Sequence, residues 1–307
     1  MNKQIRQTVL PIITAIIWGT AFVFQGTAAE EVPAFTFNFA RSLIAVAFLS
    51  ILSLCVDKYK DKKLIPREPT DFKRLLLGGS LCGICLFAAS NFQQYGITMG
   101  TSSGKAGFIT AIYMVIIPII GLFFKKRVKV VIWVAVLLSL VGLYLLCIGD
   151  GFSVQTSDVY VFICALCFAA HILVIDHFSS SLDGIKMSAV QFFVVALLSG
   201  ICALIFERGG FAGIKNCVFE IVYMGLFSSG IAYTLQIISQ KGTNPTVVSV
   251  LLSLESFFAV VAEAIIRHVA MSFREYAGCA IILIAVMITQ IDFKRKGDKS
   301  DAENAGR

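Results

Sequence analysis

The sequence predicts an all-α integral membrane protein in which ten transmembrane helices form two inverted-topology repeats of five helices each. Hydrophobic residues make up 57% of the 307 residues and charged residues only 15%, whereas about one quarter of a soluble domain is charged. Ten apolar segments are long enough to cross a bilayer, which takes about 20 residues per helix. In addition, the chain repeats itself weakly at an offset of 142 residues.

The ten predicted spans account for almost the whole chain. They cover residues 9–28, 34–55, 75–97, 106–124, 130–148, 159–178, 187–206, 217–239, 246–266 and 276–292. The longest connection, residues 57–74, is too short and too polar to form a catalytic domain. We therefore expect the function to reside inside the helix bundle or at its two mouths.

The distribution of basic residues predicts the orientation. If the N-terminus is cytoplasmic, most of the 26 Lys and Arg residues fall in inner loops. The outer side keeps Lys105, Arg208, Lys215, Arg267 and Arg274. This positive-inside bias favours an even number of spans, cytoplasmic termini and a cytoplasmic tail at residues 293–307. The net charge of +7 thus reflects topology, and no nucleic-acid partner is expected.

The first span also has features of a secretory signal peptide, namely a basic start, an apolar run and small residues after it. Removing it would leave nine spans and would invert the charge bias of every later loop. We therefore expect a retained first helix.

The internal repeat divides the chain into residues 8–148 and 157–292. Three identical residue types coincide at the offset, and they are Gln94 with Gln236, Gly100 with Gly242, and Thr101 with Thr243. With five spans each, the two halves must enter the membrane in opposite senses. An inverted repeat with a binding site between its halves is typical of alternating-access transporters.

Four segments carry a family resemblance across residues 8–292. They are Trp18-Gly19, PAFTFNFAR from Pro33 to Arg41, GKAGFITAIYMVIIPIIG from Gly104 to Gly121, and AYTLQIISQKGTNPTVVSVLLSLES from Ala232 to Ser256. Together they resemble the drug/metabolite transporter superfamily, in particular the EamA-type ten-helix carriers. The resemblance implies a secondary carrier of the plasma membrane that exports small organic metabolites or amino-acid-like solutes.

Three ionisable residues fall at membrane depth, where a charged side chain costs about 2.5 to 3.5 kcal/mol on insertion scales. Glu255 lies near the middle of the ninth span, and the repeat places it over Tyr113 of the fourth. Its carboxyl group could recognise a substrate amine or exchange a proton, or it could be a structural group paired with arginine. Arg41 could hold a substrate carboxylate through bidentate hydrogen bonds, or it could order the bundle. His171 would act as a pH switch if it lined the path, although a lone histidine in an apolar helix is more often structural.

Uncharged candidates complete the predicted substrate-binding set. Gln94 and Gln236 could be polar handles near opposite gates, and helix-to-helix hydrogen bonding is the alternative. Trp18, Phe22 and Tyr113 could form aromatic walls, although most of the 26 phenylalanines must face lipid or other helices.

Catalytic and cofactor motifs are missing from the sequence. It has no Walker A motif, no dinucleotide-binding glycine motif and no Ser-His-Asp arrangement. The Cys82/Cys85 and Cys164/Cys167 pairs lie in apolar helices without nearby histidines, so no metal is expected. The alternatives to a carrier are a membrane-embedded lipid-modifying enzyme and a flippase for lipid-linked sugars. Both a monomer and a homodimer remain open.

Overall fold

The computed structural model describes residues 5–59, 69–125, 128–148, 154–268 and 270–305. Within these ranges the chain forms helices and short connections, and no strand. The helices are η1 (Ile5–Val9), α1 (Leu10–Glu31), α2 (Ala34–Tyr59), α3 (Pro69–Thr98), α4 (Ser103–Ala111), α5 (Tyr113–Phe123), α6 (Val130–Cys147), α7 (Thr156–Phe178), α8 (Gly184–Phe206), η2 (Gly210–Asn216), α9 (Val218–Tyr223), η3 (Met224–Ala232), α10 (Tyr233–Gln240), α11 (Pro245–Leu252), α12 (Leu254–Arg267) and α13 (Phe273–Ala305).

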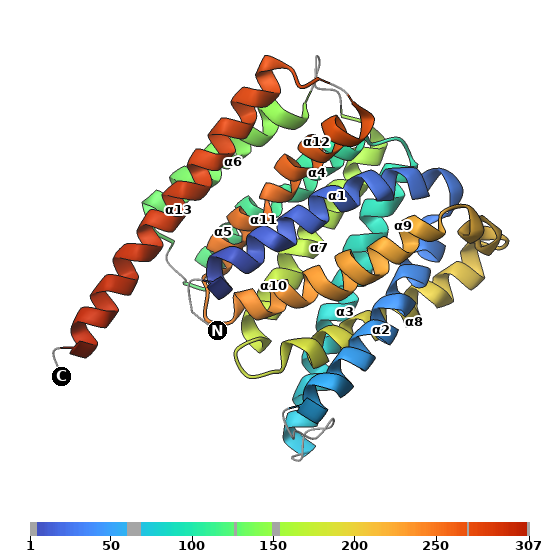
Figure 1. Cartoon of the computed structure of the whole chain (residues 1–307), viewed down its shortest axis with the longest axis horizontal. Coiled ribbons are helices and arrows are strands. Elements are labelled where there is room, and N and C mark those ends of the chain that lie inside the picture. Colours follow the sequence, from blue (N-terminus) through green and yellow to red (C-terminus); the bar gives the residue numbers. More distant parts are fainter. Residues whose placement is uncertain (1–4, 60–68, 126–127, 149–153, 269, 306–307) are drawn as a thin grey trace.

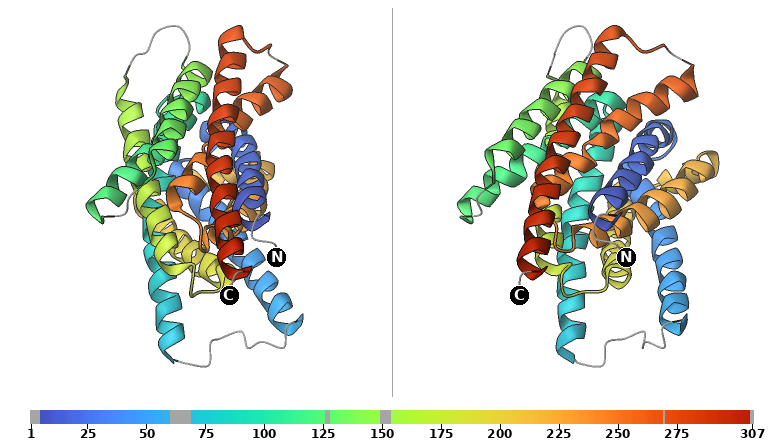
Figure 2. Two further views of the ribbon diagram at one scale, coloured as in Figure 1. Left: turned by 90° about the vertical axis from the view of Figure 1, so that its left-hand side faces the viewer. Right: turned by 60° about the vertical axis from the view of Figure 1, so that its left-hand side comes forward.

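In the described part of the chain, nine helical segments are long and apolar enough to cross a membrane. They coincide with the first nine predicted spans. Helix α13 follows at the place of the tenth and continues through most of the predicted tail, although its side chains from residue 290 onward lie outside the described residues. The all-α membrane fold is therefore confirmed, while the tenth crossing stays a prediction. Figure 2 shows the start of α1 and the end of α13 at the same end of the bundle.

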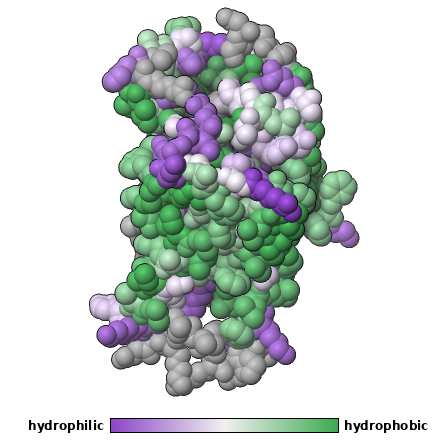
Figure 3. Space-filling view, turned by 90° about the vertical axis from the view of Figure 1, so that its right-hand side faces the viewer, coloured by the Kyte–Doolittle hydropathy of each residue, from purple (hydrophilic) through white to green (hydrophobic). Residues whose placement is uncertain are grey.

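A broad apolar band crosses the middle of the face shown in Figure 3, between two more polar ends. Large hydrophobic side chains are strongly exposed, such as Ile51 of α2 at 63% and Leu204 of α8 at 68%. A soluble protein of this size does not expose so large a contiguous apolar surface. Lipid chains are the surroundings that this band fits.

The closest helix pairs join the first half of the chain to the second. Helix α1 packs on α12, α2 on α8, α3 on α7 and α8, and α6 on α13 (Figure 1). The segment η3 of the eighth span contacts α1 and α2, much as α3 of the third span contacts α7 and α8. The two halves therefore interlock, and a residue from each can face the same central space.

Glycines allow several of these helices to approach closely. A β-carbon at Gly142 of α6 would lie 2.7 Å from a side-chain carbon of Ile282 and 2.9 Å from the backbone oxygen of Gly278. A β-carbon at Gly83 of α3 would lie 2.8 Å from the backbone oxygen of Gln191. Small residues at such contacts are the usual device for packing helices inside a membrane.

The fourth and ninth spans begin and end with corresponding backbone turns. Gly100 and Gly242, which the repeat aligns, both have positive φ angles, of 107° and 69°. Lys125 and His268, at the far ends of the same spans, are left-handed as well, with φ angles of 56° and 53°. The glycines suit their turns because a residue without a β-carbon enters this region at little cost.

Helices α2 and α8 are linked by polar contacts at both ends. At one end, the Glu207 carboxylate accepts hydrogen bonds from the backbone N–H groups of Phe35 and Thr36, at 2.9 and 2.7 Å, and from the Thr36 hydroxyl at 2.8 Å. A carboxylate there also complements the positive end of the α2 dipole. At the other end, Lys186 forms an ion pair with Asp57 at 2.9 Å. Polar contacts thus hold the pair together at both ends.

The close contact at Gly142 yields a stability prediction. Gly142→Ala places a methyl group against the Gly278 backbone, whereas Gly104→Ala meets only a carbonyl oxygen at 4.0 Å. Both changes gain the same helix propensity. We therefore expect Gly142→Ala to be less stable than Gly104→Ala by about 1–3 kcal/mol, the usual cost of overpacking. Thermal unfolding in detergent measures the difference, and equal melting temperatures would contradict the close packing of α6 on α13.

Candidate functional site

Two transmembrane segments are interrupted near their middles, one in each half of the chain. The fourth span breaks at Ile112, between α4 and α5, and the ninth at Ser253, between α11 and α12. At each break a backbone bond spans three residues, from Val115 N–H to the Ile112 carbonyl at 2.8 Å and from Ser256 N–H to the Ser253 carbonyl at 3.2 Å. Discontinuous helices in corresponding positions of two halves are typical of the binding sites of secondary transporters.

Different residues accompany the two interruptions. Pro118 lies inside α5. A proline removes one backbone hydrogen bond and clashes with the carbonyl one turn earlier, so the bend falls before it. In the ninth span, the hydroxyls of Ser249 and Ser253 donate to backbone carbonyls three residues earlier, at 2.8 Å each. Such bonds compete with the helical ladder and bend helices.

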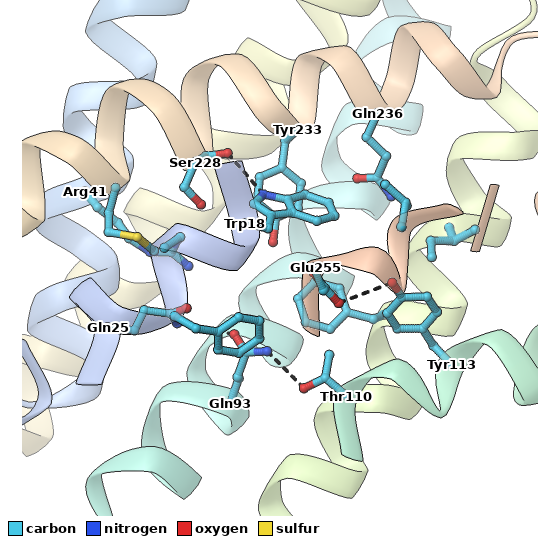
Figure 4. Close-up of a pocket in the computed structure, with 16 residues that line it drawn as sticks. Trp18, Gln25, Arg41, Gln93, Thr110, Tyr113, Ser228, Tyr233, Gln236 and Glu255 are labelled. Carbon is cyan, nitrogen blue, oxygen red and sulfur yellow. Dashed lines mark hydrogen bonds between the residues drawn. The ribbon is translucent and has the colours of Figure 1, made fainter. Parts of the chain in front are cut away.

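The interruptions bring Tyr113 and Glu255 together. Tyr113 directly follows the break at Ile112, and Glu255 is the second residue after the break at Ser253. The Tyr113 hydroxyl donates to the Glu255 carboxylate at 3.2 Å (Figure 4). Both side chains are buried. The alignment of Tyr113 with Glu255 in the repeat thus corresponds to a direct contact between the halves. The second carboxylate oxygen of Glu255, Oε2, has no hydrogen-bond partner among the described residues.

A central cavity lies beside this hydrogen bond. Its volume is about 30 Å³, which is room for about two water molecules. The residues that line it come from both halves. They are Trp18, Ala21, Phe22, Gln25, Arg41, Gln93, Thr110, Tyr113, Phe168, Ile172, Met224, Ser228, Tyr233, Gln236, Leu252 and Glu255. Six of the eight predicted substrate-binding residues are among them, and Gln94 and His171 are not.

Arg41 contributes a buried guanidinium group to the cavity wall. Its Nε donates to the Asn38 side chain at 2.7 Å, and its Nη1 donates to the Ser229 hydroxyl at 3.4 Å. The guanidinium carbon also lies 5.7 Å from the centre of the Phe37 ring. Within the described part of the chain, Arg41 has no carboxylate at ion-pair distance. Neutral groups therefore hold Arg41, and it is not the partner of Glu255 here.

A second amide fixes the group that holds Arg41. The Asn38 amide nitrogen donates to the Asn91 side chain at 2.9 Å, and Asn91 in turn donates to the Ser199 hydroxyl at 3.2 Å. This chain of bonds runs from α2 through α3 to α8. It orients the guanidinium from behind, because each member has its hydrogen-bonding direction fixed by the next.

Aromatic side chains cover another wall of the cavity. The Trp18 and Tyr233 rings lie 4.7 Å apart, and the Trp18 indole donates to the Ser228 backbone at 3.4 Å (Figure 4). Phe22 is one turn beyond Trp18 on α1 and is also buried. Trp18, Phe22 and Gln25 follow one another at spacings of four and three residues, so they share one face of the helix.

Gln93 takes the place predicted for its neighbour Gln94. Gln93 lines the cavity and donates to the Thr110 hydroxyl at 3.0 Å. Gln94 is the next residue along α3, so its side chain points away from the cavity. Its oxygen accepts a hydrogen bond from the Gln25 side chain at 3.2 Å, and its nitrogen donates to the Gln25 backbone carbonyl at 3.3 Å. In this structure Gln94 therefore links α3 to α1 by hydrogen bonds and does not line the cavity. Gln25 is a cavity residue that sequence reasoning missed, although a polar residue at membrane depth on the face of Trp18 is a readable signal.

His171 lies behind the cavity wall. Its Nε2 is 3.1 Å from the Gln191 side-chain oxygen, and its ring centre is 5.9 Å from that of Tyr233. The side chain is fully buried and does not line the cavity. A role of His171 in solute binding therefore stays a prediction.

A second hollow, of about 340 Å³, lies between α4, α6, α12 and the start of α13. Glu263 of α12 lines it together with Glu275 of α13. The residues of this hollow are all different from those of the central cavity.

A helical membrane protein with a polar cavity at two broken helices has the architecture of a membrane transporter. The EamA-like transporter family model matches residues 8–148 and again 155–291, and the chain belongs to that family. A transporter of Archaeoglobus fulgidus, itself described as uncharacterized, is 30% identical over 286 residues, which cover 91% of this chain and 84% of the relative. A solved crystal structure resembles the fold with a TM-score of 0.76 at 18% identity, over 94% of this chain and 98% of that one.

These comparisons confirm the predicted family, and the protein is a multi-pass membrane transporter. The enzyme and flippase alternatives gain no support from them.

The support of Arg41 yields a second stability prediction. Asn38→Ala leaves the Arg41 Nε and the Asn91 side-chain oxygen unpartnered in the protein interior. We expect it to lower the free energy of unfolding by about 3 kcal/mol, as removal of a partner from a buried charge does. Ser42→Ala is the matched control on the same helix, because the buried Ser42 hydroxyl has no partner among the described residues. It should change stability by less than about 0.5 kcal/mol. Equal losses in thermal unfolding would contradict the specific role of Asn38.

Proposed function

We propose that this protein is a secondary carrier that exports small organic metabolites or amino-acid-like solutes across the plasma membrane by alternating access. The observation that carries the proposal is that Arg41 and Glu255 line the same cavity without an ion pair between them. A transporter needs binding groups that a solute can use, and opposite charges that neutralised each other would be unavailable.

The two charged groups suit the two ends of a zwitterion. A guanidinium group has five N–H donors in a planar fork that fits a carboxylate. Arg41 directs only Nε and Nη1 to protein partners, so other donors remain for a solute. Glu255 offers the Oε2 oxygen to an ammonium group. In Figure 4 these side chains lie on different sides of the cavity, with Trp18 and Tyr233 on the wall between them.

The aromatic side chains suit an apolar or aromatic part of the solute. Trp18, Tyr113 and Tyr233 present ring surfaces together with one polar atom each. Such rings contribute apolar contact area, while the Trp18 N–H and Tyr113 O–H groups stay hydrogen-bonded. An amino acid with a hydrophobic side chain would find a partner for each of its three parts.

The small size of the cavity supports the proposal of alternating access. About 30 Å³ cannot hold an amino acid, so the lining helices must separate before a solute enters. The interruptions at Ile112 and Ser253 are the places where the fourth and ninth spans can bend. The interlocked helix pairs and the corresponding turns of the two halves support an inverted repeat in which the two bends exchange roles. Under the proposed orientation both termini are cytoplasmic.

The decisive experiment is uptake and efflux in proteoliposomes with a panel of amino acids and metabolites, with and without a pH gradient. Glu255→Gln keeps the size of the side chain but cannot carry a charge. We expect it to slow transport of amine-bearing solutes and to change the pH dependence. Glu263→Gln, two turns further on the same helix and outside the cavity, is the control. A Glu255→Gln protein with the rate and pH profile of the parent would refute the role of this carboxyl group.

Arg41→Lys tests the carboxylate-binding role. It retains the positive charge and loses the planar fork, so we expect KM for a carboxylate-bearing solute to rise about tenfold, equivalent to about 1.4 kcal/mol. The KM for an analogue whose carboxylate is replaced by an amide should change much less. Identical shifts for both solutes would show that Arg41 acts on the fold and not on the carboxylate.

A further inference from the structure

The buried amides at the two ends of the central cavity differ in their hydrogen bonding. At one end, Gln25 donates to the side-chain oxygens of Gln93 and Gln94 at 3.3 and 3.2 Å, and Gln94 donates back to the Gln25 backbone at 3.3 Å. Gln93 donates onward to the Thr110 hydroxyl at 3.0 Å. These groups are hydrogen-bonded to one another, so they form a polar cluster that links α1, α3 and α4.

At the other end, Gln236 and Gln240 lie one turn apart on α10. Gln236 lines the cavity, and Gln240 is the last residue of the helix. Each side chain is only 1% exposed. Within the described residues, neither the Gln236 oxygen nor either polar atom of the Gln240 amide has a hydrogen-bond partner.

The segment η1 adds a third amide to this group. It packs on α10, and the Gln7 amide nitrogen donates to the Gly242 carbonyl at 3.0 Å. The Gln7 oxygen, also buried, has no partner among the described residues. We name Gln7, Gln236 and Gln240 the inner amide track, because they follow one another from the cavity to the end of the bundle that holds the start of α1.

The apolar face of the same helix shows that burial alone does not explain the track. Ile237, between the two glutamines, packs in a hydrophobic cluster with Ile175 and Met187. Helix α10 therefore carries an apolar residue that packs against other helices and, beside it, two buried amides that pack against no such cluster. Buried polar atoms without partners are rare in native proteins and destabilise them. Several on one track call for a ligand that bonds to them for part of the time.

We propose that the inner amide track is a second solute site, which binds the hydrogen-bonding groups of the transported solute between the central cavity and the cytoplasm. The proposal rests on the transport function proposed above. The track offers carbonyl oxygens as acceptors and the Gln240 amide as a donor, with the Arg6 Nε, also unpartnered, beside Gly242. Both kinds of group suit a small zwitterion, which is the class of solute that the cavity fits. The hydrogen-bonded amides at the opposite end hold that side closed in this conformation.

Gln240→Leu tests the site by separating stability from transport. Leucine removes the unpartnered polar atoms at similar volume, so we expect the melting temperature in detergent to rise by about 2 °C or more. Transport in proteoliposomes should nevertheless slow about fivefold, as expected for one lost hydrogen bond to the solute. Gln94→Leu is the control, because it breaks the bonds with Gln25 and should lower the melting temperature. A Gln240→Leu protein that is destabilised, or that is stabilised and transports at the parent rate, would overturn the proposal.

Labelling with a membrane-impermeant thiol reagent gives a readout that does not depend on the solute. Above the background of the parent protein, Gln240→Cys should react about tenfold faster than Ser239→Cys, its fully buried neighbour on the helix, because only the track opens to water. Equal, slow labelling of both from either side of the membrane would refute the track. If Gln240→Cys reacts and no solute is moved, the track stands and the transport function fails.

Discussion

Every polar side chain at membrane depth needs a hydrogen-bond partner, because the lipid interior supplies none. This constraint organises the bundle. Arg41 is held by Asn38 and Ser229, and Asn38 is held in turn by Asn91. Through these bonds the second, third and eighth spans acquire a fixed relation to one another. The constraint is not fully met at several buried atoms, and those of Glu255 and the inner amide track are the ones that we propose a solute uses.

The helix interruptions determine where this capacity lies. A continuous helix would point Tyr113 and Glu255 wherever its regular rotation placed them. The breaks at Ile112 and Ser253 free the local backbone, and the two side chains meet across the interface of the halves. The cavity beside this contact has aromatic and polar walls.

The sequence predicts the fold class well, because length and hydropathy are summed over long segments and tolerate local error. The sequence also singles out Glu255 and Arg41, which both line the central cavity, since an ionisable residue in an apolar span is a strong signal. Gln93 and Gln94 show the limit. They are adjacent in an apolar helix, and only the rotation of α3 about its axis decides which faces the cavity. The break at Ser253 is equally hard to foresee, because it depends on serine hydroxyls bonding to their own helix and not on proline.

The fastened pair of α2 and α8 has a consequence for how the cavity changes shape. Glu207 and the Asp57–Lys186 ion pair hold these helices together at both ends, and the Asn38–Asn91–Ser199 chain adds a tie between them through α3. Arg41 therefore belongs to a helix pair that is tied at both ends, whereas Glu255 lies just after the interruption of the ninth span at Ser253. Bending at Ser253 would therefore change the distance between the Glu255 carboxylate and the Arg41 guanidinium group. If a solute bridges the two groups as proposed, the length of solute that fits between them would therefore change as the ninth span bends.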